Sequence, residues 1–224
     1  MPEAHNRCAS FELEFQWSST RAKLARVFIY RRGNWVVACR YLEKPLGRIG
    51  ASKMKIEMKL SASLYGTIMA DLRRRHPFAH ERVGFCTVRQ SSTGDGVLLL
   101  VERYTPVSDE HYIKDSSVGA RIGEPALTQA MHLAYHGRAS GTGVFHVHLH
   151  DLPGPTGMSR DDIASIPQVV DGIRQVNPGA PHGLVIFSSN HAYAAASAAN
   201  SKKLERVDAV SVIGPRILTF KNRG

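Results

Sequence analysis

The sequence predicts an α/β or α+β protein in which helices pack beside a mixed β-sheet. Stretches with alternating apolar residues, typical of half-buried strands, recur along the chain, and stretches with apolar residues at helical spacing lie between them. Hairpin-like pairs of strands indicate that the sheet is not purely parallel. A chain of 224 residues, of which 43% are hydrophobic, is long enough to bury one substantial core.

The first part of the chain is predicted to form a β-rich N-terminal extension. Strand-like stretches lie at residues 11–15, 27–30 and 35–38. The last two flank Arg32-Gly33-Asn34, whose composition is typical of a hairpin turn. We therefore expect an extension over residues 1–50 and a main domain over residues 51–224.

A strand and a helix are predicted to open the main domain. Apolar residues alternate with lysine and glutamate from residue 54 to residue 60, which indicates a half-buried strand. Ser61 and Ser63 then offer N-caps for a helix whose apolar residues recur at helical spacing as far as Arg75. The helix is expected to end there because Pro77 disfavours a helical conformation in the residue before it.

The remaining elements alternate between strands and helices. We expect strands at 83–88 and 97–101, a helix from Pro125 to Gly137, a histidine-rich strand, a helix over 161–175 and strands at 184–187 and 207–213. The strand at 97–101 is a candidate antiparallel partner for the strand at 83–88. The alanine-rich stretch from His191 to Asn200 is expected to form a short helix or a mobile loop.

The densest group of potential metal ligands is His146-Val147-His148-Leu149-His150, followed by Ser159-Arg160-Asp161-Asp162. Alternation in a strand places the histidines on one face and the intervening apolar residues on the other. Two histidines and one aspartate would give zinc three protein ligands and leave a fourth position for water. We interpret the pattern as the metal site of a zinc hydrolase.

Hydrolysis at such a site also needs a carboxylate that takes a proton from the attacking water. Glu81 is the candidate, because Glu81-Arg82-Val83-Gly84-Phe85 leads from a predicted helix into an apolar strand. A position at the junction of a loop and a strand suits a base that must be held in place.

Together these residues resemble the JAB/JAMM (MPN+) metalloproteases, whose pattern is a glutamate, His-x-His, a short loop and Ser-x-x-Asp. The resemblance covers roughly residues 50 to 190. It implies a JAB/MPN-like (cytidine-deaminase-like) fold for residues 51–224, Zn²⁺ as the cofactor, Glu81 as the base and Ser159 as a donor to the oxyanion. Ser159 is also a candidate helix N-cap, and the two roles can coexist.

The histidine motif can be aligned with the family in two ways. His150 leaves eight residues before Ser159, whereas His148 leaves ten, and the shorter loop is similar to that of the family. This favours His148, His150 and Asp162 as the metal ligands. The alternative is His146 with His148, because Gly143-Val144-Phe145 resembles the glycine and aromatic residues that precede the family's first histidine.

The resemblance implies an isopeptidase or peptidase that removes a ubiquitin-like protein from its conjugate or processes its C-terminal tail. The segment from Ser159 to Asp162 is similar to prokaryotic JAB sequences, including deconjugases encoded with ubiquitin-like modifiers and E1-like and E2-like enzymes in antiphage operons. Residues 106–123 resemble in position the insertion that contacts the protein substrate, although a plain surface loop is equally expected. The alternatives are a JAB hydrolase acting on a sulfur-carrier protein adduct in biosynthesis, and a metal-free JAB-like binding scaffold.

Composition and charge narrow the classes of partner that we expect. No segment approaches the roughly twenty apolar residues that span a bilayer, and Met1 to Arg7 lacks an apolar signal core, so we expect a cytoplasmic protein without membrane contact. The net charge of +10 would attract nucleic acid, but the basic residues are spread along the chain without an aromatic-basic motif. Nucleic acid is therefore not the expected partner.

Overall fold

A computed structural model describes the backbone of residues 12–13, 24–31 and 34–41, and residues 54–94, 96–150 and 155–221 in full. The chain divides into two compact units, Met1–Lys53 and Met54–Gly224. The predicted boundary near residue 50 and most of the predicted strand at 11–15 lie outside the described residues.

The first unit contains a small antiparallel sheet with the strand order β1-β2-β3. Its strands are β1 (Glu12–Leu13), β2 (Leu24–Arg31) and β3 (Asn34–Tyr41). Phe28 of β2 lies opposite Val37 of β3 in an antiparallel register, which confirms the predicted hairpin.

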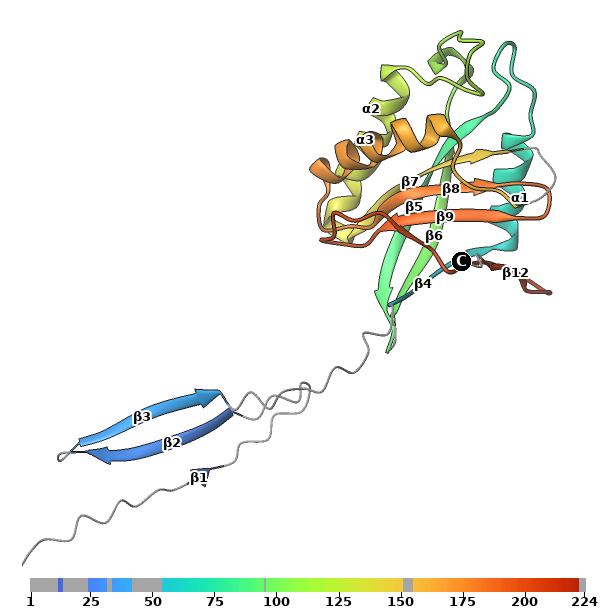
Figure 1. The fold of residues 1–224 in the computed structure, drawn as a ribbon. Coiled ribbons are helices and arrows are strands. Elements are labelled where there is room, and N and C mark those ends of the chain that lie inside the picture. Colours follow the sequence, from blue (N-terminus) through green and yellow to red (C-terminus); the bar gives the residue numbers. More distant parts are fainter. Residues whose placement is uncertain are drawn as a thin grey trace, which may run out of the picture. The chain divides into compact units, whose positions relative to one another are not determined.

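The second unit is a mixed α/β structure around one large curled sheet (Figure 1), as the predicted fold class requires. Nine described strands form it in the order β10-β9-β8-β7-β5-β6-β4-β11-β12. Their bounds are β4 Lys55–Ser61, β5 Val83–Ser92, β6 Gly96–Pro106, β7 Thr142–Leu149, β8 His182–Phe187, β9 Ala192–Ser197, β10 Glu205–Arg206, β11 Ala209–Ile213 and β12 Leu218–Lys221. The histidine strand β7 is central, antiparallel to β5 and parallel to β8.

The two faces of this sheet carry different helices. The described helices are α1 (Ala62–Leu72), α2 (Glu124–Gly137) and α3 (Arg160–Val176), with short 3-10 turns η1 (Asp109–His111) and η2 (Arg138–Ser140). Helix α1 packs over β4 and β6, whereas α2 and α3 lie together over β7 and β8 (Figure 1). Among the described residues, no helix combines the length and apolar character that crossing a bilayer requires.

Alternation along β7 separates the core from the histidines, as predicted. Phe145, Val147 and Leu149 belong to the core cluster that also contains Ile68 and Met69 of α1. His146 and His148 therefore point to the opposite face of the sheet, toward α2 and α3. Every residue of β7 is buried, so these imidazoles are held in a packed environment.

Two expectations about local structure were wrong, and one strand was not expected. Helix α1 ends at Leu72 rather than at Arg75, because Arg74 N–H bonds to the carbonyl of Asp71 and begins a turn. The alanine-rich stretch after His191 is strand β9, whose pairing with β8 overrides the helix propensity of alanine. Strand β12 was not predicted, and it forms because β11 offers it an antiparallel edge.

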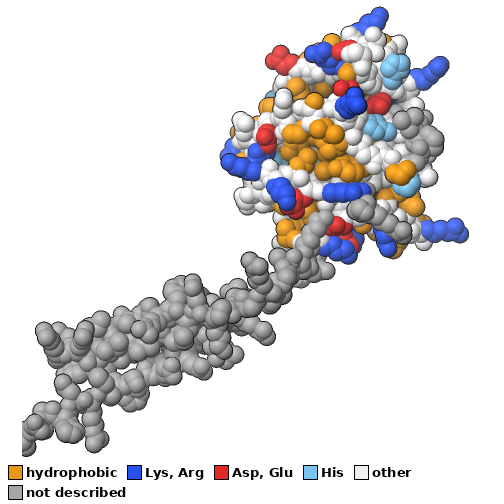
Figure 2. All heavy atoms as spheres, viewed as in Figure 1, with side chains coloured by type: hydrophobic (Ala, Val, Ile, Leu, Met, Phe, Trp, Pro, Cys, Tyr) orange, Lys and Arg blue, Asp and Glu red, His pale blue; other side chains and the backbone are white. Residues whose placement is uncertain are grey.

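Charged side chains are spread over the second unit. On the face that Figure 2 shows, lysine and arginine side chains surround an apolar patch and alternate with acidic ones. They do not gather into one continuous basic surface on that face.

Candidate metal centre

Three segments converge at one end of β7. His148 and His150 come from the end of this strand, Asp162 from the first turn of α3, and Glu81 from the residues just before β5. In the antiparallel pair of β5 and β7, Val83 lies opposite His148. Continuing this register by two residues brings Glu81 beside His150, so strand pairing joins residues that are far apart in the sequence.

The side-chain atoms form a tight cluster. The Nε2 atoms of His148 and His150 are 3.1 Å apart, and Asp162 Oδ2 lies 3.6 Å from the first and 3.7 Å from the second. Glu81 Oε1 lies 3.9 Å from His150 Nε2. The structure thus brings together both favoured histidines, the favoured aspartate and the predicted base.

Ser159 holds Asp162 in a capping box at the start of α3. The backbone N–H and the hydroxyl of Ser159 each donate to Asp162 Oδ2 at 2.8 Å, and the Asp162 N–H donates to Ser159 Oγ at 3.1 Å. The predicted N-cap is therefore confirmed. The hydroxyl proton is directed at Asp162, so a role of Ser159 as an oxyanion donor would require the hydroxyl to rotate.

His146 lies behind His148 rather than in the cluster. Its Nδ1 is 3.4 Å from Nδ1 of His148, while the Asp162 carboxylate lies 3.6 Å from Nε2 of His148. Thr156 makes a comparable contact from the other direction, with its hydroxyl 3.4 Å from His150 Nδ1. In His148 and His150, Nδ1 therefore contacts a neighbouring side chain, His146 or Thr156, while Nε2 faces the centre of the cluster.

Hydrogen bonds hold Glu81 and the residues immediately before and after it. The N–H groups of His80 and Glu81 both donate to the carbonyl of Gly119, at 2.9 and 3.0 Å. The next residue, Arg82, is 1% exposed and donates to the carbonyl of Arg74 at 2.7 Å and to Asp109 at 2.6 Å. The Glu81 segment is therefore anchored to the end of α1 and to the loop after η1.

The charges of the centre follow from burial and proximity. Burial raises the pKa of Glu81 against the opposing effect of the neighbouring imidazoles, and burial together with His148 lowers the pKa of His150. Burial lowers the pKa of His146 to about 3. Burial alone would raise the pKa of Asp162, but His148 and the Ser159 hydrogen bonds hold it below its usual range. These shifts favour neutral His146 and His150 and an ionised Asp162, and a metal ion binds unprotonated imidazole and carboxylate groups.

The donor set fits a divalent cation. Ligand atoms placed tetrahedrally about 2.1 Å from zinc are about 3.4 Å from each other. The separations of 3.1, 3.6 and 3.7 Å among His148, His150 and Asp162 are close to this value. Glu81, His148 and His150 also lie within 4.8 Å of one another, but the Asp162 oxygen is nearer to the imidazoles than Glu81 is. Nitrogen and carboxylate donors suit several divalent ions, so the geometry alone does not select zinc.

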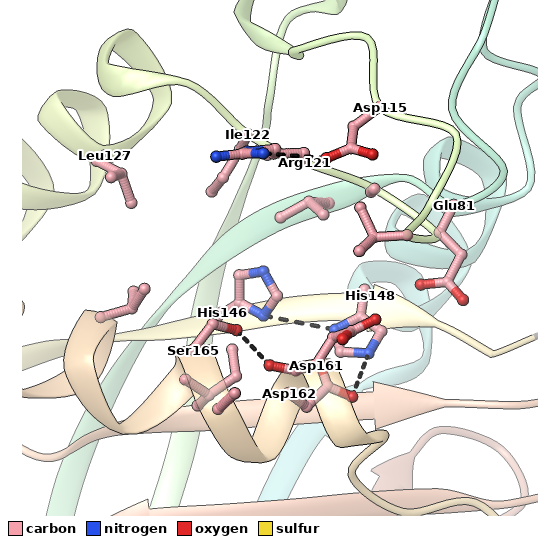
Figure 3. Close-up of a pocket in the computed structure, with 16 residues that line it drawn as sticks. Glu81, Asp115, Arg121, Ile122, Leu127, His146, His148, Asp161, Asp162 and Ser165 are labelled. Atoms are coloured by element: carbon pink, nitrogen blue, oxygen red, sulfur yellow. Dashed lines mark hydrogen bonds and ion pairs between the residues drawn. The ribbon is translucent and has the colours of Figure 1, made fainter.

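A cavity of about 380 Å³ opens from the centre toward α2 and α3 (Figure 3). His146, His148 and Asp162 line it at the end where the centre lies, and Glu81 lies at the same end. The loop before α2 and the inner sides of α2 and α3 supply the rest of the wall. A molecule bound in this cavity would lie next to His148 and Asp162.

Neither the protein-family models nor the curated proteins that were compared with this sequence give a match. The geometry of the site therefore carries the functional argument.

Sequence reasoning did not find Gly119, Thr156 or the residues of the cavity wall. Gly119 and Thr156 lie in loops, where no periodic pattern reports a side chain's direction. The apolar residues of α2 and α3 predict helices by their spacing, but spacing alone does not distinguish a core contact from a cavity wall.

Proposed function

We propose that the protein is a zinc-dependent isopeptidase or peptidase of the JAB/JAMM type. It would remove a ubiquitin-like protein from its conjugate or process the C-terminal tail of such a protein. The resemblance of Glu81, the histidine pair, Ser159 and Asp162 to that family motivates the choice of substrate and of a JAB/MPN-like fold.

One observation carries the proposal. His148, His150, Asp162 and Glu81 come from three separate segments, yet their polar atoms lie close together. The two Nε2 atoms are 3.1 Å apart, Asp162 Oδ2 lies 3.6 and 3.7 Å from them, and Glu81 Oε1 lies 3.9 Å from His150 Nε2. Buried or half-buried imidazoles rarely face each other and two carboxylates without a function, because desolvation of so many polar groups is costly. A shared cation would compensate that cost.

The ligand set supported by this geometry is His148, His150 and Asp162. His146 approaches His148 at Nδ1, whereas the Asp162 carboxylate approaches it at Nε2, so Asp162 faces the nitrogen that His148 directs toward His150 and not the one that it directs toward His146. His146 instead orients His148 through Nδ1, as groups behind metal-ligating histidines commonly do.

Each residue then has a defined task. Zinc, when bound, supplies a Lewis acid that polarises a carbonyl group and makes a water molecule more acidic. Glu81 takes a proton from the attacking water and delivers it to the leaving amine, and its anchored backbone keeps the carboxylate beside His150. Ser159 holds Asp162, and after rotation of its hydroxyl it would donate to the oxyanion.

The proposed partners are a ubiquitin-like protein, its conjugates and E1-like and E2-like enzymes of a bacterial antiphage operon. The loop between η1 and α2 supports a role in substrate contact, because it borders both Glu81 and the cavity. A cytoplasmic location remains part of this proposal.

The test uses the purified full-length chain loaded with zinc. A ubiquitin-like protein is fused through its C terminus to a reporter, and release of the reporter is measured by electrophoresis and mass spectrometry. We expect cleavage at the end of the modifier, loss of cleavage with a chelator, and recovery when zinc is restored. Glu81→Gln should lower the rate by roughly 10² to 10⁴ without loss of bound zinc.

Three other outcomes would contradict the proposal. Cleavage that survives the chelator or Glu81→Gln would reject the metal mechanism. Bound zinc with hydrolysis only of a small-molecule adduct on a sulfur-carrier protein would favour the biosynthetic alternative. Absence of bound metal together with salt-sensitive binding of DNA or protein would favour the scaffold alternative.

A further inference from the structure

The proposed base lies in a short segment, residues 80–83, that is held by the loop between β6 and α2. The Gly119 carbonyl of this loop accepts the N–H of Glu81 and the N–H of the residue before it. The Tyr112 hydroxyl accepts the N–H of Val83 at 2.7 Å. These contacts use the backbone of the segment, whereas Arg82 is held through its side chain.

The Arg82 side chain is buried and bonds in two directions. Its Nε donates to the carbonyl of Arg74, in the turn that follows α1, at 2.7 Å. Its Nη2 donates to Asp109 Oδ1, in η1, at 2.6 Å and lies 3.4 Å from the Arg75 carbonyl. One guanidinium group therefore joins the base segment to the end of α1 and to the loop that also carries Gly119.

Stability alone does not account for a buried arginine at this position. Removing a guanidinium group from water is costly, and an apolar side chain of similar volume is often as stable as a buried ion pair. Among the described residues, Arg82 Nη1 has no hydrogen-bond partner, which adds to this cost. An arginine provides direction instead, because its donors lie in one rigid plane. The contacts of Arg82 therefore indicate a geometric role.

Arg82 and Glu81 share a peptide group but contact different parts of the molecule. Glu81 Oε1 lies 3.9 Å from His150 Nε2, whereas the Arg82 guanidinium group contacts Asp109. Because the peptide group between them is planar and rigid, a displacement of the Arg82 backbone moves the point from which the Glu81 side chain extends. The Arg82 side chain therefore limits where the carboxylate of the base can lie.

We propose that Arg82 is a positioning residue for the hydrolysis, whose side chain fixes the backbone at Glu81 and thereby places the carboxylate beside His150. The inference rests on the proposed function and adds to it a residue that acts through Glu81. It also makes the position of the base depend on Asp109, and hence on the loop that is proposed to contact the substrate.

Arg82→Met tests this role in the cleavage assay, because methionine is a flexible apolar side chain without the guanidinium group. We expect kcat of the zinc-loaded full chain to fall roughly 100-fold, the effect of a misplacement of about 1 Å, while KM and the bound zinc stay unchanged. Arg82→Lys keeps the charge and one donor group, so its loss in kcat should be smaller. Circular dichroism checks that each variant is folded, and Arg82→Lys serves if Arg82→Met is not.

Arg174→Met is the matched control. Arg174 Nη2 donates to Asp171 Oδ1 at the same distance of 2.6 Å, but this ion pair joins two residues of α3. The control variant therefore loses an arginine and an ion pair of the same kind elsewhere in the fold. It should cleave at the wild-type rate.

Hydrogen exchange tests the role of Arg82 without a measurement of activity. In the metal-free full chain, the N–H groups of His80, Glu81 and Val83 are bonded to the loop and should exchange slowly. Arg82→Met should raise their exchange rates roughly tenfold, because the segment loses a hydrogen bond between charged groups. Arg174→Met should leave these rates unchanged.

Three results would overturn the positioning role of Arg82. They are a folded Arg82→Met variant with the wild-type kcat, one with wild-type exchange at these N–H groups, and one that loses bound zinc in proportion to kcat. Failure of the proposed function is distinguishable, because the wild-type chain would then bind no zinc or cleave without needing it. The exchange experiment would still decide whether Arg82 holds the segment.

Discussion

The carboxylate of Glu81 lies directly against Gly119. A Cβ atom on Gly119 would be 2.7 Å from Cδ of Glu81 and 2.9 Å from each of its oxygens. The Gly119 carbonyl also accepts the N–H of Glu81 at 3.0 Å. One loop residue therefore fixes the backbone of the proposed base and limits where its side chain can lie.

Gly119→Ala should impair hydrolysis while the fold and the metal site remain. Gly119 does not have a positive φ, so alanine fits its backbone and the new methyl group must instead displace the flexible end of Glu81. A displacement of about 1 Å in a catalytic group can cost roughly 100-fold in rate. We expect a loss of that order in the cleavage assay, with bound zinc unchanged by elemental analysis.

Gly179→Ala is the matched control, because a Cβ on Gly179 would meet no atom within 4 Å. This variant should cleave at the wild-type rate. Wild-type activity in Gly119→Ala would show that the loop does not position Glu81.

Substitution of the three histidines one at a time should separate the two possible ligand sets. We expect His150→Ala and His148→Ala to lose the bound zinc, because both Nε2 atoms face Asp162. His146→Asn should keep one equivalent of zinc, with an affinity reduced by roughly 10- to 100-fold, because it changes only the group behind His148. Zinc retained by His150→Ala and lost by His146→Asn would instead support the His146 and His148 set.

Ser159→Ala should separate capping from catalysis. Loss of the side-chain cap should lower the free energy of unfolding by about 0.5 to 2 kcal/mol, measured by urea denaturation. Ser61→Ala is the control, because Ser61 caps α1 in the same way and accepts the Leu64 N–H at 3.2 Å. If Ser159 also donates to the oxyanion, only Ser159→Ala should lose roughly 10²- to 10³-fold in kcat. If Ser159→Ala and Ser61→Ala both changed kcat only slightly and equally, Ser159 would act as a helix cap and not as an oxyanion donor.

The metal-free protein should lose stability as the pH falls below about 6.5. His182 is fully buried, its Nδ1 accepts the Val144 N–H, and its Nε2 contacts the Asn177 carbonyl. Burial lowers the pKa of His182, so the unfolded chain binds a proton that the folded chain does not. Stability is therefore fully present above the unfolded pKa and is lost as the pH falls from there toward the folded pKa.

His182→Gln should reduce the slope of the free energy of unfolding against pH by up to about 1.4 kcal/mol per pH unit. This is the slope expected when unfolding is coupled to the uptake of one proton. His132→Gln, which changes an exposed histidine of α2, should leave it unaltered. Chemical denaturation between pH 5 and pH 7 with a chelator present measures both. An unchanged pH dependence in His182→Gln would mean that His182 takes up its proton without unfolding.

Much of the fold follows from local patterns in the sequence. The alternation of Phe145, His146 and Val147 specifies a strand with two different faces, and Ser159 with Asp162 specifies the start of a helix. These features depend on neighbours in the chain, so they can be predicted without the rest of the molecule. Strand β9 could not be predicted in this way, since its alanines adopt an extended form only because β8 pairs with them.

The clustering of the candidate residues was predictable from the sequence, whereas the surroundings of the cluster were not. His148, His150 and Asp162 form a pattern of residue types that one chemistry explains. The position of Gly119 against Glu81 depends on how the loop after η1 folds back, and that depends on long-range contacts such as Arg82 with Asp109. No local pattern encodes such a contact.

The parallel pairing of β11 with β4 has a consequence for synthesis of the chain on the ribosome. The N–H of Ile56, in β4, donates to Asp208 just before β11, although these residues are 152 positions apart. Until residues 209–213 have emerged, β4 has one unpaired edge, and such edges attract other strands. A nascent chain interrupted between β4 and residue 209 would therefore present a surface for chaperones or for aggregation.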